Sequence, residues 1–384
     1  SVSGALIVGG AAQFNSTVTV VGNAVFTADI QKKTAGTSNF AAGVNAGNSI
    51  ESGGNYNVVV GDEAGTAITT GDNNVAVGYQ ALDANTTGYS NTALGVAALG
   101  TNVSGLGNTA VGANALDIST ANYGTAVGDN ALGANTSAGN GTAVGANALS
   151  ANTTGGSNTA VGKNALTANT TGAQNTAMGL EAGKSITTGT YNDFFGFRAG
   201  DLTTTASNNV GIGSNTLGAN TTGASNTAVG SSALVANTTG ASNVAVGYSA
   251  LSANTTASNN IAVGYQAGYS GTTGSPNEYL GYQAGYSNLI GVQNTGVGYT
   301  ALKLNTNSYN SAFGSSALTA NTSGSQNNAF GRLALYSNTT GAQNSGFGNG
   351  ALQANTTASD NTAVGHNALL ANTTGASNVA VGAA

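Results

Sequence analysis

Apolar residues recur along most of the chain in short groups that are separated by polar, turn-like stretches. From Asn39 onward the pattern reads Asn-x-Ala-Val-Gly-x-x-Ala-Leu-x-x-Asn-Thr-Thr-Gly-x-x. We number its positions as slots 1–17, so that the glycine that sets the phase occupies slot 5. Successive slot-5 glycines lie 17 residues apart, except for one step of 18 and two steps of 16. Twenty repeats start between Asn39 and Asn361, and a partial repeat starts at Asn378. A repeat of this regularity predicts a linear array rather than separate globular domains.

Each unit is too short for a pair of helices, and it is rich in Thr, Val, Gly and Asn, which are poor helix formers. Slots 2–4 and 8–9 read as short extended pieces, while the slot-5 glycine and the Asn-Thr-Thr-Gly segment supply turns. We therefore expect an all-β fold, a β-solenoid or β-roll of about 20 coils with one 17-residue repeat per coil. Coils stacked about 4.8 Å apart would form a rod roughly 100 Å long. The expected organisation is a strand-rich lead-in segment, residues 1–38, followed by the repeat shaft, residues 39–384.

Small and apolar residues occupy fixed slots of the repeat. Slot 4 is apolar, slot 3 is usually Ala, and slot 8 is Ala in 19 of 20 units, with Thr216 as the exception. Adjacent strand residues face opposite sides, so both faces of the strand are expected to be buried. This favours packing against other copies of the chain, with the alanines of slot 3 or slot 8 facing those copies. A wide monomeric solenoid with an Ala-lined interior is the alternative.

The composition limits the classes of partner. Only 5% of the 384 residues are charged, the net charge is −6, and the seven basic residues are scattered. Such a chain would not neutralise a phosphate backbone, so nucleic acid is not expected as a partner. The sequence contains no run of 18 apolar residues, so it predicts no membrane-spanning helix and no insertion into a membrane. The absence of Cys excludes disulfides and zinc-thiolate sites.

Candidate catalytic groups are isolated from one another in the sequence. His366 is the only His and occupies the variable slot 6, where we expect a surface residue. Acidic pairs that a glycosidase would need, Asp62 with Glu63 or Asp193 with Asp201, occur once each and are not repeated. The calcium-binding spacing Gly-Gly-x-Gly-x-Asp is missing. We expect no enzyme, no cofactor and no metal site.

An aromatic stripe is the strongest candidate for recognition. Tyrosine occupies slot 6 in four consecutive coils, and two of these coils also carry tyrosine at slot 10; the residues are Tyr248, Tyr265, Tyr282 and Tyr299, with Tyr269 and Tyr286. Tyrosines stacked about 4.8 Å apart could hold sugar rings by stacking and by hydroxyl hydrogen bonds. The alternative is that these rings cover the outer face or pack between chains.

Two further ladders have competing interpretations. Twelve units have Asn-x-Thr/Ser at slot 12, including Asn85, Asn152, Asn169, Asn237 and Asn372, which matches a glycosylation acceptor. Turn chemistry explains this motif better, because glycans on neighbouring rungs would be closer than their own width. The threonines of slots 13 and 14 suggest an ice-binding solenoid. Adjacent strand residues point apart, however, so a flat face with two threonine columns is not encoded.

Units such as "NVAVGYQAL" (74–82) and "NVAVGYSAL" (243–251) resemble the head repeats of trimeric autotransporter adhesins. The longer unit "NVAVGYQALDANTTG" (74–88) is similar to repeats of phage tail fibres that carry a C-terminal self-cleaving chaperone domain. The resemblance covers residues 39–384 and implies a homotrimeric fibre shaft on a virion or in the extracellular space. It implies attachment to a host or cell surface. The aromatic stripe makes a cell-surface polysaccharide a candidate partner.

The alternative that this resemblance allows is a bacterial adhesin or surface filament. The chain departs from both families: autotransporter head repeats are shorter than 17 residues, and no stalk heptads, membrane anchor or chaperone domain accompany the repeats here. We expect a cleaved or excerpted fibre to explain these differences.

Overall fold

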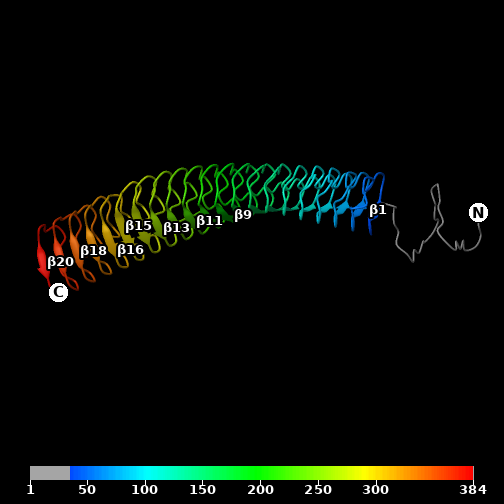
Figure 1. Ribbon diagram of the computed structural model, residues 1–384. Helices are drawn as coiled ribbons and strands as arrows, with labels where there is room; N and C mark the ends of the chain where they lie inside the picture. Colours follow the sequence, from blue (N-terminus) through cyan, green and yellow to red (C-terminus); the bar gives the residue numbers. More distant parts are fainter. Residues whose placement is uncertain (1–34, 384) are drawn as a thin grey trace, which may run out of the picture.

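The computed structural model describes residues 35–383, which form a long, gently curved rod (Figure 1). One strand from each coil joins a single 21-stranded sheet. Neighbouring strands are parallel and in register, as where Thr227 pairs with Val244 and Val229 pairs with Val246. The predicted all-β solenoid of about 20 coils, with one repeat per coil, is confirmed. Of the lead-in segment predicted for residues 1–38, residues 1–34 lie outside the described part.

All strands are short and follow one another at the spacing of the repeat. Their bounds are β1 Phe40–Ala42, β2 Val58–Val60, β3 Val75–Val77, β4 Thr92–Leu94, β5 Thr109–Val111, β6 Thr125–Val127, β7 Thr142–Val144, β8 Thr159–Val161, β9 Thr176–Met178, β10 Asp193–Phe195, β11 Val210–Ile212, β12 Thr227–Val229, β13 Val244–Val246, β14 Ile261–Val263, β15 Asn277–Leu280, β16 Asn294–Val297, β17 Ser311–Phe313, β18 Asn328–Phe330, β19 Ser345–Phe347, β20 Thr362–Val364 and β21 Val379–Val381.

Hydrogen bonds between coils continue outside the strands. In the turn-rich part of the coil, the backbone N–H of Leu234 donates to the carbonyl of Ala250 (3.0 Å), and that of Thr238 donates to Thr255 (2.8 Å). Each coil is therefore held to the next around much of its circumference. Because every coil contacts only its neighbours, the structure is a quasi-one-dimensional stack.

The slot-5 glycine is required where the chain leaves the strand. Gly95 has a φ of 139°, a backbone region that is essentially restricted to glycine. A Cβ atom added to Gly95 would lie 2.5 Å from the carbonyl oxygen of Gly112 in the next coil. Backbone conformation and close packing of neighbouring coils therefore both demand glycine, which explains why slot 5 sets the phase of the repeat.

The interior of each coil is lined by small residues. Ala160 at slot 3 and Ala165 at slot 8 are fully buried, together with Leu166 at slot 9. The expectation that the alanines of slots 3 and 8 face other chains is therefore wrong. They are buried within their own coil, where most units leave space for only a small side chain at these two slots.

Asparagines form a buried polar ladder at slot 1. The side-chain oxygen of Asn209 accepts hydrogen bonds from the backbone N–H (3.0 Å) and from Nδ2 (3.2 Å) of Asn226 in the next coil. Nδ2 of Asn226 also donates to the carbonyl of Gly240 (2.9 Å), which closes the coil across its interior. A side chain with both a donor and an acceptor can repeat this pattern from coil to coil, which explains the choice of Asn.

Two aromatic side chains replace the usual alanine at slot 3, and glycines make room for them. Phe194 is fully buried, and a Cβ atom on Gly211 of the next coil would lie 2.9 Å from its ring. Tyr279 is similarly buried, and a Cβ atom on Gly296 would lie 3.2 Å from its ring. The Tyr279 hydroxyl accepts a hydrogen bond from Nδ2 of Asn288 (2.7 Å), and burial raises its pKa. The large side chain at slot 3 of one coil is thus compensated by the missing side chain at slot 3 of the next, so the total side-chain volume of the interior changes little.

Candidate functional site

The outer face of the sheet carries a continuous apolar column at slot 4. Its side chains are partly exposed along the rod, for example Leu94 (47%), Val144 (37%) and Phe347 (40%). Near the C-terminal end the rings of Phe313, Phe330 and Phe347 stack, with centroids 4.7 and 5.1 Å apart. Slot 4 therefore forms a ridge of apolar side chains, which we call the slot-4 ridge, on the opposite side of the strand from the buried slot 3.

The structure brings the four tyrosines of slot 6 together in one ladder. The ring centroids of Tyr248, Tyr265, Tyr282 and Tyr299 are separated by 5.4, 5.3 and 5.1 Å in turn, and neighbouring rings are within 13° of parallel. The end rings, Tyr248 (52%) and Tyr299 (57%), are more exposed than Tyr265 (44%) and Tyr282 (42%) between them. Each inner ring is stacked against a ring on both sides, so its edge and hydroxyl are the parts most accessible to a ligand.

A second pair of stacked rings lies in the two central coils of this ladder. Tyr269 and Tyr286, at slot 10, have centroids 5.0 Å apart and are half-buried. At slot 7, Nε2 of Gln283 donates to Oε1 of Gln266 (2.9 Å). The sequence "GYQAGYS" occurs at 264–270 and again at 281–287, so two consecutive coils present the same set of phenol and amide groups.

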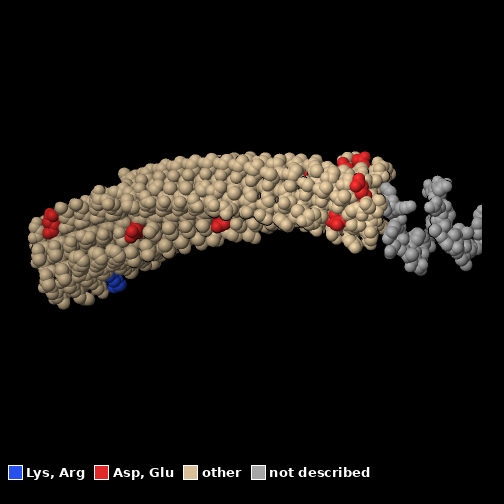
Figure 2. Space-filling view, viewed as in Figure 1, with Lys and Arg blue, Asp and Glu red and all other residues tan. Residues whose placement is uncertain are grey.

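Charged residues are sparse on the rod and unevenly distributed. Figure 2 shows one nearly uncharged face, on which acidic side chains gather near the β1 end. A small charged cluster lies in the coils of β9 and β10, where Nε of Arg198 donates to Glu181 (2.8 Å) and Nζ of Lys184 approaches the other carboxylate oxygen (3.4 Å). The hydrogen bond from Arg198 is the main reason that the pKa of Glu181 is lowered.

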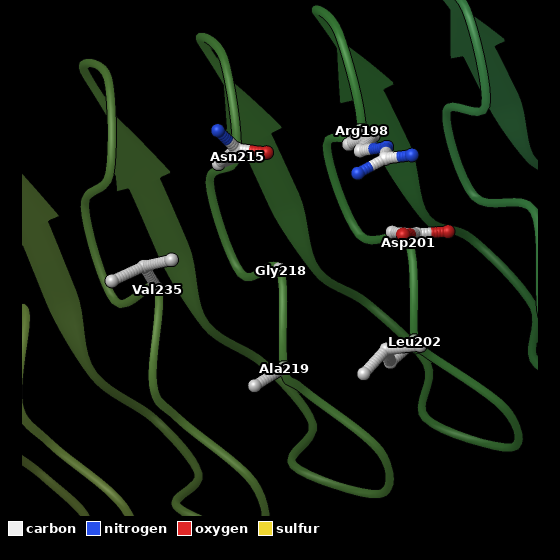
Figure 3. A pocket seen from close by; sticks show the side chains of 7 residues that line it. All are labelled: Arg198, Asp201, Leu202, Asn215, Gly218, Ala219 and Val235. Atoms are coloured by element: carbon white, nitrogen blue, oxygen red, sulfur yellow. The ribbon is translucent and has the colours of Figure 1, made fainter.

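A shallow pocket of about 260 Å³ adjoins this cluster (Figure 3). Arg198 and Asp201 stand on one side of it and Val235 on the other, with Gly218 between them. Because Gly218 has no side chain, the pocket is a gap in the slot-10 column of the coil surface. Burial raises the pKa of Asp201. No second carboxylate lines the pocket.

The candidate catalytic residues are placed as follows. His366 is exposed at slot 6. Asp62 accepts a hydrogen bond from the backbone N–H of Val44 (3.0 Å), and Glu63 accepts one from Gln80 (2.8 Å). Asp193 lies in β10, whereas Asp201 lies at the pocket of Figure 3, which Asp193 does not line. Within residues 35–383 no group of three His, Cys, Asp or Glu side chains could hold a metal ion.

The asparagines of slot 12 are buried in the coil, except Asn372 at the C-terminal end of the rod, which is half-buried. Asn237 is fully buried, and its Nδ2 donates to Oδ1 of Asn220 (2.9 Å) and to the carbonyl of Gly240 (2.9 Å). The nitrogen that would carry a glycan is therefore occupied inside the folded coil, as the turn interpretation of this motif requires. The neighbouring threonines differ in exposure. Thr238 is half-buried and donates to the carbonyl of Thr255 (3.0 Å), while Thr239 is exposed. This is one exposed threonine column rather than the flat double column of an ice-binding face.

Sequence reasoning missed the glutamine pair, the charged cluster and the two buried aromatic residues. The glutamines could have been found from the repeated "GYQAGYS". Glycine at slot 3 in the coils after Phe194 and Tyr279 was a signal that a large side chain intrudes from the neighbouring coil. In the described part of the chain no helix is long and apolar enough to cross a membrane. No protein-family model matches the chain, and the comparison with curated proteins finds no match.

Proposed function

We propose that this chain is the shaft of a homotrimeric fibre on a virion surface or in the extracellular space, which serves attachment to a host or cell surface. Phage tail fibres are the class that it resembles most, and a bacterial adhesin or surface filament is the alternative. The single observation that carries the proposal is the slot-4 ridge, an apolar surface that runs along the whole described rod. A catalytic role is not part of the proposal, because the candidate acids and His366 form no common site.

The sheet face that carries the ridge has the extent of a stable protein interface. Twenty steps of about 4.8 Å give a length of roughly 100 Å, and the two outward columns at slots 2 and 4 give a width of about 10 Å. The face of one chain therefore measures roughly 1,000 Å², compared with about 800 Å² per partner in a standard interface. Slot 2 is most often Thr and includes Asp193 and Glu278, so the apolar part of this face is the continuous slot-4 column. An exposed apolar column of this length indicates a binding partner.

A second copy of the chain is the partner that fits the ridge best. Slot 4 is apolar in every coil, whereas slot 6 includes Asp129, Lys163, Ser231 and Arg332 and is therefore unsuited to a continuous apolar seam. Parallel copies in register would place each slot-4 side chain beside its own equivalent, so large residues such as Phe330 would meet at the same height. Closed cyclic symmetry then limits the assembly to a fixed number of chains, and the resemblance indicates three.

A charge placed on the ridge tests this assembly. In Phe330→Glu the new carboxylate would be solvated in a single chain, because Phe330 is 37% exposed there, but it would be buried at the seam of a trimer. We expect Phe330→Glu to lower the mass measured by light scattering to that of one chain, 36.8 kDa, with the β-sheet circular dichroism spectrum retained. Ser315→Glu, which adds the same charge at the exposed slot 6 of the preceding coil, should leave the assembly intact. An unchanged mass for Phe330→Glu would refute the ridge as the interface.

A further inference from the structure

The four coils that start at Asn243, Asn260, Asn277 and Asn294 carry a surface unlike the rest of the rod. The slot-6 tyrosine ladder runs along one side of it, and the stacked pair Tyr269 and Tyr286 marks slot 10. The hydrogen-bonded pair Gln266 and Gln283 occupies slot 7, between these two columns in the chain. We call this surface the tyrosine–glutamine face. From it we infer a binding site for an extended polysaccharide that lies along the rod axis and is recognised through phenol hydroxyls and amide groups.

The stacking of the rings determines how a ligand can bind. A sugar that lies flat on an aromatic ring needs an open ring face, but Tyr265 and Tyr282 are each stacked between two neighbours. Only the outer faces of Tyr248 and Tyr299 remain for flat stacking, in agreement with their greater exposure. The inner rings offer their edges and hydroxyl groups, each of which both donates and accepts hydrogen bonds. Of the two modes expected from the sequence, ring stacking and hydroxyl hydrogen bonds, recognition along the inner part of the ladder is therefore by hydrogen bonds.

The spacing of the groups selects the kind of polymer. The ladder repeats every 5.1–5.4 Å, which is close to the advance per sugar ring in an extended polysaccharide. An extended polypeptide presents side chains on one face about every 6.6–6.8 Å, so it would lose register with the tyrosines within the ladder. A hydroxyl-rich polymer can instead place an equivalent group opposite each rung.

The charge of the face favours the same ligand. At slots 6, 7 and 10 of these four coils the sequence has one charged residue, Lys303. The remaining groups are phenols, amides and small hydroxyl side chains, which suit neither a phosphate backbone nor a strongly charged peptide. The single hydrogen bond between the two glutamines is donated by Nε2 of Gln283 and accepted by Oε1 of Gln266, so the two amides retain further donors and acceptors for a ligand. An uncharged glycan is therefore the best match.

Removal of the hydroxyl groups alone tests this mode of binding. The fourfold variant Tyr248→Phe, Tyr265→Phe, Tyr282→Phe and Tyr299→Phe keeps the stacked rings and loses the four phenol hydroxyls. The matched control changes four exposed tyrosines outside the face to Phe, namely Tyr56, Tyr123, Tyr191 and Tyr309. Retention of each protein is measured on an array of immobilised bacterial and plant polysaccharides, with oligosaccharides of increasing length as competitors.

We expect the parent and the control variant to bind at least one uncharged polysaccharide, and the ladder variant to bind it at least tenfold more weakly. Competition should strengthen with oligosaccharide length up to about four sugars, the number of rungs, and then level off. Failure of the parent to bind any polysaccharide, equal binding by the ladder variant, or competition by monosaccharides as strong as by tetrasaccharides would each overturn the inference. The polysaccharide site rests on the proposed attachment role. The mass of each variant by light scattering tests the trimeric assembly separately, so the binding site and the assembly can each be refuted without the other.

Discussion

Replacement of one asparagine in the slot-1 ladder should have a large and local effect. In Asn226→Ala four side-chain hydrogen bonds are lost. Two of them are donated by Nδ2 of Asn226, to Asn209 and Gly240, and two are accepted by its Oδ1 from the backbone N–H and Nδ2 of Asn243. All four lie in the fully buried interior of the coil.

The loss in free energy of unfolding depends on which buried groups are left without any hydrogen-bond partner. The carbonyl of Gly240 still accepts from Asn237, and Nδ2 of Asn243 still donates to Ala257. The backbone N–H of Asn243 loses the acceptor Oδ1 of Asn226 and becomes a buried donor without a replacement. Each lost hydrogen bond costs about 1 kcal/mol and an orphaned buried donor costs about 1–3 kcal/mol, and since such effects are not additive we expect about 3–5 kcal/mol in all.

Amide hydrogen exchange is the appropriate assay, because a stack of coils can open locally without unfolding as a whole. The amide of Asn243 should exchange at least tenfold faster in Asn226→Ala than in the parent, and the melting temperature should fall. Asn349→Ala, at an exposed slot-6 position, should change stability by less than about 0.5 kcal/mol. If Asn226→Ala behaves like Asn349→Ala, the slot-1 ladder does not hold the coils together as described.

Two further substitutions and a change of pH each have a defined expected effect on the stability of the rod. Ala165→Leu should overpack the coil interior and cost about 1–3 kcal/mol in thermal melting, with the mass by light scattering unchanged because slot 8 is not an interface. Gly141→Asn should fill a natural gap in the slot-1 ladder and raise stability by about 1 kcal/mol, since a Cβ atom there meets Leu132 at an ordinary 3.4 Å. A shift from pH 7 to pH 4 should maintain or raise the melting temperature. Burial raises the pKa of three carboxyl groups in the folded chain, Asp83, Asp117 and Asp201, so protonation of these groups favours the folded state as the pH falls. The lowered pKa of Glu181 acts in the opposite direction, but it is one group against three. A clear acid-induced fall in melting temperature would contradict this.

The coil architecture could be predicted because the most regular residue of the repeat, the slot-5 glycine, is fixed by the conformation of the backbone. Glycine at slot 5 has a positive φ and contacts the next coil, so its 17-residue spacing reports the length of each coil directly. The side that each slot faces was harder to predict. Alternation along a strand shows that slots 3 and 4 face opposite sides, but it does not show which of them is inside. The pattern alone is therefore compatible with an interface position for Ala160 at slot 3, although this residue lies within its own coil.

The candidate site was only partly predictable for a similar reason. The period placed Tyr248, Tyr265, Tyr282 and Tyr299 above one another, and the structure stacks them. The orientation of the rings depends on side-chain rotamers that the repeat does not encode, so the sequence could not show that the inner ring faces are covered. The contact between Gln266 and Gln283 depends on rotamers in the same way.

The mass and length of the purified chain test the central claim most directly. Multi-angle light scattering combined with small-angle X-ray scattering should give about three times the chain mass of 36.8 kDa for a rod no shorter than about 100 Å, the length of one solenoid. Three parallel chains in register would add mass without adding length. A monodisperse particle of 36.8 kDa would contradict the account, because the slot-4 ridge would then remain exposed along the whole rod.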